Sequence, residues 1–343
     1  IGFEHPLEHL QRGLLLASHY LARRMAVRGG PFLPLGPVHK RRMLDPYISM
    51  PMAEDGPNYS LMSHFGVNGV LARMQVWDYC KNNAIPELNA PDYESKIAAL
   101  RQRCREAARY GIDLYLDVCH WGGFPANCKL FKSRPEVRGA EFFYSVKPRT
   151  FDLCSSNPDV LSCYNESFAN IFRDVPELGG LNLIVGGEGL MHCFSRPKPP
   201  REGGTNCPRC KGRNASEDVA RLVNGIAQAI HGVRPDARVF AWPYSAHLWS
   251  GKDDPAQRQF IANLLPEVCL ISNFETPFHY RLGETDAWLV DYNILNLGPS
   301  ERFSKQSATL AEKGMPHYAK TESSTSVFFF SVPYIPVHYR WFE

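Results

Sequence analysis

Several features that mark particular protein classes are absent from this sequence. No stretch approaches the roughly 18 uninterrupted apolar residues of a membrane-spanning helix, so we expect no membrane partner. The formal net charge of the 343 residues is only +3, and the basic residues are spread along the chain. This pattern predicts no nucleic-acid partner. The dinucleotide-binding glycine fingerprint and the P-loop motif are both missing, which argues against the open-sheet folds that carry them.

What is present is a regular alternation of strand-like and helix-like segments. We expect helices at residues 92–110, 157–172, 255–265 and 300–313, and a further helix that begins at position 214. We expect strands at residues 43–50, 66–73, 112–120, 181–185, 238–242, 269–274 and 317–321. Such alternation is typical of βαβ units around a parallel sheet. Seven such units favour a sheet that closes into a barrel over an open sheet. The sequence predicts an α/β fold, a (β/α)8 TIM barrel truncated before its eighth strand.

Local signals mark the ends of several of these helices. Asp92 is placed to cap the first of them, and Pro158 occupies a first turn, where proline is favoured. Residues 214–217 have the pattern of a capping box. Gly314 follows the last helix, as a C-terminal cap would.

The barrel does not account for the first part of the chain. Residues 1–38 are expected to form an N-terminal helical and linker segment, and residues 39–343 the glycoside-hydrolase-like barrel. The chain starts at Ile1 and ends in what should be the seventh helix. We therefore expect the sequence to be a segment of a longer protein.

In a TIM barrel, functional residues gather at the C-terminal ends of the strands. Here those ends are rich in carboxylates, amides and aromatic rings, the side chains that bind sugar hydroxyls and stack on sugar rings. The sequence therefore predicts a carbohydrate substrate and no cofactor for catalysis. The candidate catalytic residues are Glu188, Glu275 and Glu322. The candidate substrate-binding residues are Asp45, Asp117, His120, Trp121, His192, Trp242, Tyr244 and Asn273.

Several motifs resemble those of barrel glycoside hydrolases. They are Leu183-Ile-Val-Gly-Gly-Glu188-Gly, Asn206-Cys-Pro-Arg-Cys210, Arg41-Arg42-Met43, Phe240-Ala-Trp-Pro-Tyr244 and Tyr318-Ala-Lys-Thr-Glu-Ser323. Over positions 40 to 340 the chain is similar to the β-N-acetylhexosaminidase-like barrels, family 20 and its relatives. The resemblance implies hydrolysis of a glycosidic bond in a glycan that contains N-acetylhexosamine. The sequence departs from the family at Gly187, where family 20 has the aspartate of an Asp-Glu pair that orients the acetamido group.

The roles of the carboxylates follow from their positions. Glu188 ends the fourth strand and is the expected acid/base, with glycines on both sides that would leave room for substrate. Glu322 ends the seventh strand, across the barrel mouth, and is the expected partner; Glu275 is the alternative. This placement is similar to that of the large barrel clan with its acid/base on strand four and its nucleophile on strand seven.

Two other classes of function compete with a glycoside hydrolase. One is a carbohydrate-binding barrel that has lost catalysis. The other is a different barrel enzyme, such as a metal-dependent hydrolase. The second lacks the His-x-His pair after strand one and the strand-end histidines that a catalytic metal needs.

The ten cysteines include one pair with the spacing of metal ligands. Cys207 and Cys210 form a Cys-x-x-Cys turn, and Cys193, with His192 beside it, lies in the same loop after the fourth strand. Two thiolates from one turn are a common half of a tetrahedral zinc site. The sequence predicts a structural zinc ion on Cys193, Cys207 and Cys210; a local disulfide and free thiols are the alternatives.

Overall fold

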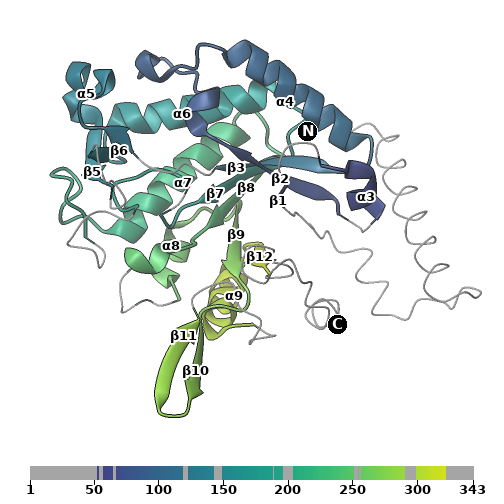
Figure 1. The fold of residues 1–343 in the computed structure, drawn as a ribbon, viewed down its shortest axis with the longest axis vertical. Coiled ribbons are helices and arrows are strands. Elements are labelled where there is room, and N and C mark those ends of the chain that lie inside the picture. Colours follow the sequence, from purple (N-terminus) through teal and green to yellow (C-terminus); the bar gives the residue numbers. More distant parts are fainter. Residues whose placement is uncertain are drawn as a thin grey trace, which may run out of the picture.

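The computed structural model describes residues 52–53, 57–64, 67–118, 123–142, 149–187, 189–195, 204–250, 254, 256–289 and 299–321. Its main feature is a seven-stranded parallel sheet whose strands follow the order of the chain (Figure 1). The strands are β1 (Met52–Ala53), β2 (Gly69–Met74), β3 (Asp113–Val118), β7 (Gly180–Ile184), β8 (Arg238–Trp242), β9 (Val268–Asn273) and β12 (His317–Lys320). Each pairs in parallel with the next. The predicted α/β fold of a truncated (β/α)8 barrel is confirmed, with β1 and β12 as the sheet edges in the described part of the chain.

Helices link the strands, as the alternation predicts. They are α3 (Tyr59–His64), α4 (Tyr93–Ala108), α5 (Lys129–Ser133), α6 (Pro158–Asp174), α7 (Ala215–His231), α8 (Arg258–Asn263) and α9 (Glu301–Lys313). Asn157, Asn214 and Ser300 cap α6, α7 and α9, because each side chain accepts a hydrogen bond from a backbone N–H of the first turn. The cap predicted at Asp92 is wrong. Its side chain makes no capping bond and lies 3.3 Å from the ammonium of Lys96 instead.

Two parts of the structure were not predicted. Between β3 and α6, a three-stranded antiparallel sheet in the order β4-β6-β5 consists of β4 (Phe124–Pro125), β5 (Arg138–Glu141) and β6 (Thr150–Leu153). After β9, the strands β10 (Phe278–Leu282) and β11 (Thr285–Leu289) form a hairpin that projects from the sheet (Figure 1). The strand predicted at residues 43–50 and the N-terminal segment 1–38 lie outside the described residues.

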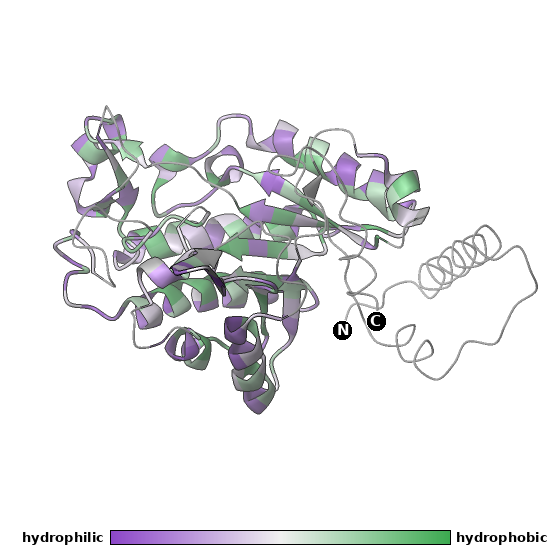
Figure 2. Ribbon diagram, turned by 60° about the horizontal axis from the view of Figure 1, so that its bottom comes forward, coloured by the Kyte–Doolittle hydropathy of each residue, from purple (hydrophilic) through white to green (hydrophobic). Residues whose placement is uncertain are grey.

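The main hydrophobic core lies between the sheet and the helices that cover one of its faces (Figures 1 and 2). Alternate strand residues point to opposite faces of a sheet, so each strand gives this core every second side chain. On β3 these are Leu114, Leu116 and Val118. The helical face predicted for α7 is fully buried there: Val219, Leu222, Val223, Ile226 and Ile230.

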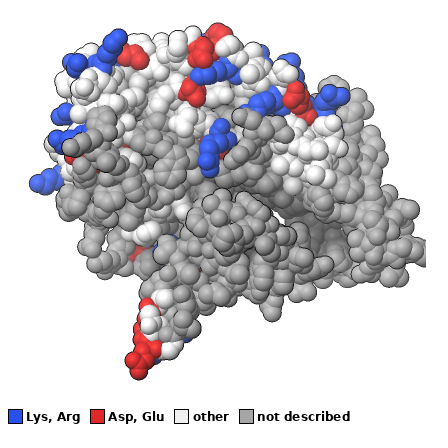
Figure 3. All heavy atoms as spheres, viewed as in Figure 1, with Lys and Arg blue, Asp and Glu red and all other residues white. Residues whose placement is uncertain are grey.

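The surface carries charges of both signs. Lys and Arg are interspersed with Asp and Glu over the helical side, and acidic residues gather on the projecting hairpin, where Glu284 and Asp286 are exposed (Figure 3). None of the helices in the described ranges is long and apolar enough to cross a bilayer.

Candidate active site

The face of the sheet opposite the helices, here called the inner face, has an apolar half. A second hydrophobic cluster forms there from Leu71, Tyr115, Phe240, Cys269 and Ile271, with Trp242 and Tyr318 packed against it. These residues come from five strands of the sheet, β2, β3, β8, β9 and β12, at alternate positions. They fill the inner face, as side chains fill the interior of a barrel.

Beyond this cluster, toward the C-terminal ends of the strands, the inner face becomes polar. Arg73, Asp117 and Asn182 are register partners on β2, β3 and β7. Asp117 and Asn182 are buried, and the Asn182 amide donates a hydrogen bond of 2.6 Å to Oδ1 of Asp117. Burial raises the pKa of Asp117 above its ordinary value, whereas the bond from Asn182 and the charge of Arg73 lower it. Asp117 is therefore a buried carboxyl group held in one orientation.

A second polar group lies on the same face at the ends of β8, β9 and β12. The Trp242 indole N–H donates a hydrogen bond of 2.9 Å to Oδ1 of Asn273. The ring centroids of Trp242 and Tyr244 are 5.2 Å apart, and Nζ of Lys320 lies 5.9 Å from the Trp242 ring centroid. The structure therefore brings together Trp242, Tyr244 and Asn273, all three of which the sequence predicts as substrate ligands.

These residues line a depression of about 440 Å³, a volume that includes the solvent in its mouth. Arg302 of α9 also lines it, a residue that the sequence analysis did not single out. Its Nε atom is buried and has no hydrogen-bond partner among the residues that the structure describes. Burial lowers the pKa of this guanidinium. The depression thus joins an indole face, an amide and a cation, a combination suited to a hydroxylated ligand.

The described residues of the loop after β7 make close backbone contacts. The Val185 N–H donates to the carbonyl of Trp242 at 2.9 Å, and the Leu190 N–H donates back to the carbonyl of Ile184 at 2.8 Å. A Cβ atom on Gly186 would overlap the carbonyl oxygen of Tyr244, and one on Gly189 would lie 2.5 Å from that of Val118. Gly189, which was predicted to leave room for substrate, is instead required by close contact between backbones.

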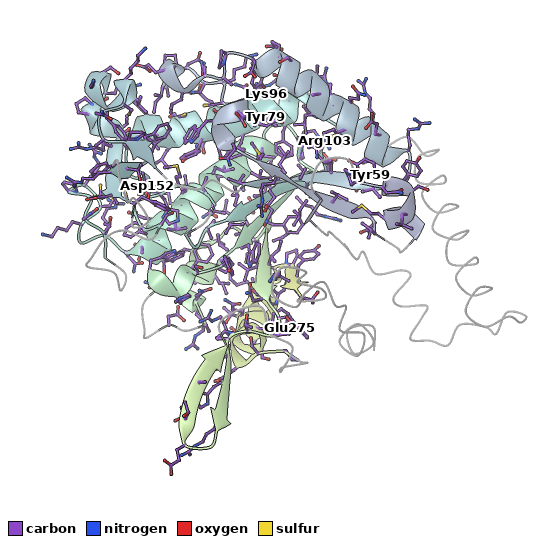
Figure 4. The ribbon with its side chains drawn as sticks, in the orientation of Figure 1. Tyr59, Tyr79, Lys96, Arg103, Asp152 and Glu275 are labelled. Carbon is purple, nitrogen blue, oxygen red and sulfur yellow. The ribbon has the colours of Figure 1, made fainter. Side chains whose placement is uncertain are left out.

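Several predicted site residues lie outside the described residues. Glu188 itself is one of them, although Gly187 and Gly189 on either side are described. The others are Asp45, His120, Trp121 and Glu322. Glu275 is described and is only 1% exposed, two residues after Asn273 and beside α9 (Figure 4). Of the three candidate carboxylates, Glu275 alone has a described environment.

His192 occupies a different place from the one predicted. It is fully buried behind the loop after β7. Its Nε2 lies 2.9 Å from the Val185 carbonyl, and its Nδ1 accepts from the Phe194 N–H at 3.2 Å. Burial lowers the pKa of this imidazole to about 4. Both ring nitrogens of the neutral histidine are occupied, so neither is available to a sugar hydroxyl or to a metal ion.

The three cysteines of the predicted metal site do come together, with a fourth that sequence reasoning missed. Cys193, Cys207, Cys210 and Cys154 are all buried, and their sulfur atoms lie within 4.8 Å of one another. Cys154 directly follows β6, in the antiparallel sheet that was not predicted. Its sequence surroundings, Leu153 before it and two serines after it, gave no sign that it would reach the other three.

One buried acid in the same region has no counterpart in the sequence analysis. Asp152 of β6 is fully buried, and neither of its carboxyl oxygens has a hydrogen-bond partner within the described ranges (Figure 4). Burial raises its pKa well above the ordinary value. Burial therefore favours the neutral, protonated form of this group.

Comparisons with known proteins give likenesses of fold. No protein-family profile matches the chain, and no curated protein matches it in sequence. A family 5 glycoside hydrolase from Streptomyces cattleya in complex with GlcNAc is 17% identical, with a TM-score of 0.37 over 62% of this chain and 44% of its own. The family 20 exo-β-N-acetylglucosaminidase from Vibrio harveyi is 9% identical, with a TM-score of 0.44 over 80% of this chain and 41% of its own.

A second family 20 enzyme, the β-N-acetylhexosaminidase from Streptomyces coelicolor A3(2), is 10% identical, with a TM-score of 0.43 over 81% of this chain and 48% of its own. The chain thus spans less than half the length of each of these three proteins. All three are glycoside hydrolases, and two belong to the family that the sequence motifs resemble.

Proposed function

We propose that the protein is a glycoside hydrolase whose substrate binds on the inner face, at the C-terminal ends of the strands. The observation that carries the proposal is the change from apolar to polar side chains along that face, toward the C-terminal ends of the strands. Apolar side chains fill most of the face, while Asp117 with its partner Asn182, and also Trp242, Asn273 and Lys320, lie toward the C-terminal ends of the strands. In TIM barrels this end of the strands is where catalysis takes place.

The chemistry of this layer suits a sugar. The carboxylate and amides accept and donate hydrogen bonds to hydroxyl groups, and the indole offers a flat apolar face for a pyranose ring. A metal-dependent hydrolase would need a cluster of histidines and carboxylates. Within the described ranges, the one group of three or more potential ligands is the buried cysteine cluster, which lies in the loop region and not on this face.

The proposed mechanism uses two carboxyl groups on opposite sides of the scissile bond. Glu188, in the loop after β7, donates a proton to the leaving oxygen, because a bound sugar would bury it and raise its pKa. Glu322, two residues after the end of β12, attacks the anomeric carbon or activates water. Glu275 after β9 is the alternative partner. A gap of about 5 Å between the two groups gives retention, and about 6.5–9.5 Å gives inversion.

The proposed substrates are glycans that contain N-acetylhexosamine, the class implied by the resemblance to family 20. Gly187 stands where that family has the aspartate that orients the acetamido group. We therefore assign the second catalytic role to a carboxylate of the protein and not to the acetamido oxygen of the substrate.

The test is a screen of the whole chain against 4-nitrophenyl glycosides, including the N-acetylglucosaminide and the N-acetylgalactosaminide. The proposal expects release of nitrophenol from at least one of them. The matching thermal shift is measured with the free sugars, because a ligand that binds only the folded state raises Tm. No hydrolysis together with a sugar-dependent rise in Tm would identify a binding protein and overturn the proposal. If neither hydrolysis nor a rise in Tm is observed, carbohydrate is excluded as the ligand.

A further inference from the structure

Four buried sulfur atoms meet at one point between the antiparallel sheet and the loop after β7. Sγ of Cys154 lies 3.8 Å from Sγ of Cys207 and 3.7 Å from Sγ of Cys210. Cys193 completes the group, and all four sulfurs lie within 4.8 Å of one another. No sulfur among the described cysteines is in a disulfide.

These spacings are those of a tetrahedral metal site. With zinc–sulfur bonds of about 2.3 Å, neighbouring thiolates in a tetrahedron lie about 3.8 Å apart. A disulfide would bring two sulfurs to about 2.05 Å. We propose that Cys154, Cys193, Cys207 and Cys210 bind one zinc ion. Four protein ligands leave no position for water or substrate, so the site is structural.

The turn that carries two of the ligands is built to present both sulfurs on one side. The backbone N–H groups of Cys210 and Lys211 both donate to the Cys207 carbonyl, at 3.2 and 2.9 Å. Gly212 then takes a φ of +82°, a conformation that favours glycine. The Cys207 N–H is held by the Thr205 hydroxyl oxygen at 3.2 Å. The turn is therefore fixed by its own backbone.

Groups around the cluster suit the charge that it would carry. Zinc with four thiolates has a formal charge of about −2, so it needs nearby donors. The Arg209 side chain, which comes from the turn between Cys207 and Cys210, places a cation near the Cys154 sulfur, and its Nη1 donates to the Glu136 carbonyl at 2.8 Å. The Ser156 hydroxyl lies 3.3 Å from the Cys210 sulfur. One cation and one hydroxyl thus face the sulfurs.

The ligands come from three segments, which hydrogen bonds also join. Cys154 follows β6, Cys193 lies in the loop after β7, and Cys207 and Cys210 precede α7. The Thr205 hydroxyl donates to the Cys193 carbonyl at 2.6 Å, and the Asn206 side chain accepts from the Glu141 N–H at 2.9 Å. A zinc ion here would fasten the antiparallel sheet to the loop that contains position 188.

The experiment measures bound metal and does not depend on hydrolytic activity. The whole chain is purified without chelator, and its zinc is determined by plasma mass spectrometry. Near-stoichiometric zinc is expected in the unmodified protein and in the control Cys128→Ser. Cys128 lies outside the cluster, and its sulfur accepts the α5 capping bond, which a serine hydroxyl can also accept. Cys154→Ser should lose most of the zinc.

Cobalt exchange into the unmodified protein keeps the test decisive if Cys154→Ser does not fold. Tetrahedral sulfur ligation predicts strong visible bands and sulfur-to-cobalt charge transfer. Absence of zinc would overturn the proposal, as would stoichiometric iron in its place. So would peptide mapping that finds any of the four cluster cysteines unalkylated under denaturing, non-reducing conditions with chelator, because that result indicates a disulfide within the cluster.

Discussion

Asn182 on β7 donates a hydrogen bond of 2.6 Å to Oδ1 of Asp117 on the neighbouring strand β3. The two residues are register partners on the inner face, and both are almost completely buried. The second carboxyl oxygen of Asp117 has no hydrogen-bond partner in the described part of the chain. One oxygen is thus fixed by the protein, and under the proposed function the other would accept a hydrogen bond from the substrate.

Replacing Asp117 by Asn should weaken the proposed reaction without unfolding the protein. A hydrogen bond to a charged group contributes about 1.5–3 kcal/mol, so kcat/KM should fall by roughly tenfold to a hundredfold. Tm should change little, because the amide is of similar size and avoids a buried charge. The matched control is Asp113→Asn, at the opposite end of β3, where kinetics should be unchanged. Equal kinetics in both variants would remove Asp117 from the site.

The indole of Trp242 is expected to carry part of the sugar affinity. Trp242→Ala removes the aromatic face, and Kd or KM for the sugar should rise about tenfold, which corresponds to about 1.4 kcal/mol. Trp242→Phe keeps an aromatic face but loses the hydrogen bond to Asn273, so its effect should be smaller. Titration of each variant with sugar, followed by fluorescence, measures the difference. An alanine variant with unchanged affinity would show that Trp242 is only part of the interior packing.

Gly186 should tolerate no side chain. A Cβ atom there would overlap the Tyr244 carbonyl oxygen, so Gly186→Ala must displace the loop after β7 or the loop after β8. The expected result is a loss of about 1–3 kcal/mol in the free energy of unfolding, the scale of overpacking. Gly232→Ala is the control, because its Cβ would make only ordinary contacts and its φ is −62°. Denaturant unfolding compares the two, and equal stability would contradict the close approach at Gly186.

Asp152 should make stability fall as the pH rises. Its pKa in the folded protein is raised by burial, whereas in the unfolded chain it is about 3.9. Between these values the folded state holds a proton that the unfolded state has released, so the free energy of unfolding declines with increasing pH. Asp152→Asn has no such proton. The variant's stability relative to the unmodified protein should therefore improve steadily from about pH 4 upward.

Urea unfolding of Asp152→Asn and of the unmodified protein at several pH values measures the difference in their free energies of unfolding. The total change in this difference should be about 1.4 kcal/mol for each unit by which the pKa is raised. Glu312→Gln, an exposed position on α9, should show no such trend. A difference between Asp152→Asn and the unmodified protein that stays constant with pH would mean that the carboxyl is not protonated in the fold.

The fold could be predicted where each element carries its own signals. The strands of the barrel sheet are short apolar runs, and α6, α7 and α9 have local caps at Asn157, Asn214 and Ser300. Asp92 fails as a cap because Lys96, one turn on, offers its carboxylate a charged partner. The sheet β4-β6-β5 was not predicted because its strands are short and are held partly by residues distant in the sequence. One example is the Asn206 side chain, which accepts a hydrogen bond from the Glu141 N–H.

The candidate site residues also differ in whether the sequence around them carries a signal. Asp117, Trp242 and Asn273 could be predicted because they end strands. Asn182 could have been found, since an amide between Leu181 and Leu183 in a buried strand points to the opposite face from its neighbours. Cys154 could not, because only the fold brings it to the distant Cys-x-x-Cys turn.

Glu188→Gln tests the central claim most directly. The amide cannot donate the proton that a poor leaving group needs, so kcat should fall at least about a hundredfold, the scale of general acid catalysis. Activated aryl glycosides should lose less than substrates with sugar leaving groups, and Tm should be unchanged. Glu267→Gln, exposed just before the N-terminal end of β9, should keep full activity. Near-normal kcat for Glu188→Gln on a substrate with a sugar leaving group would contradict the account.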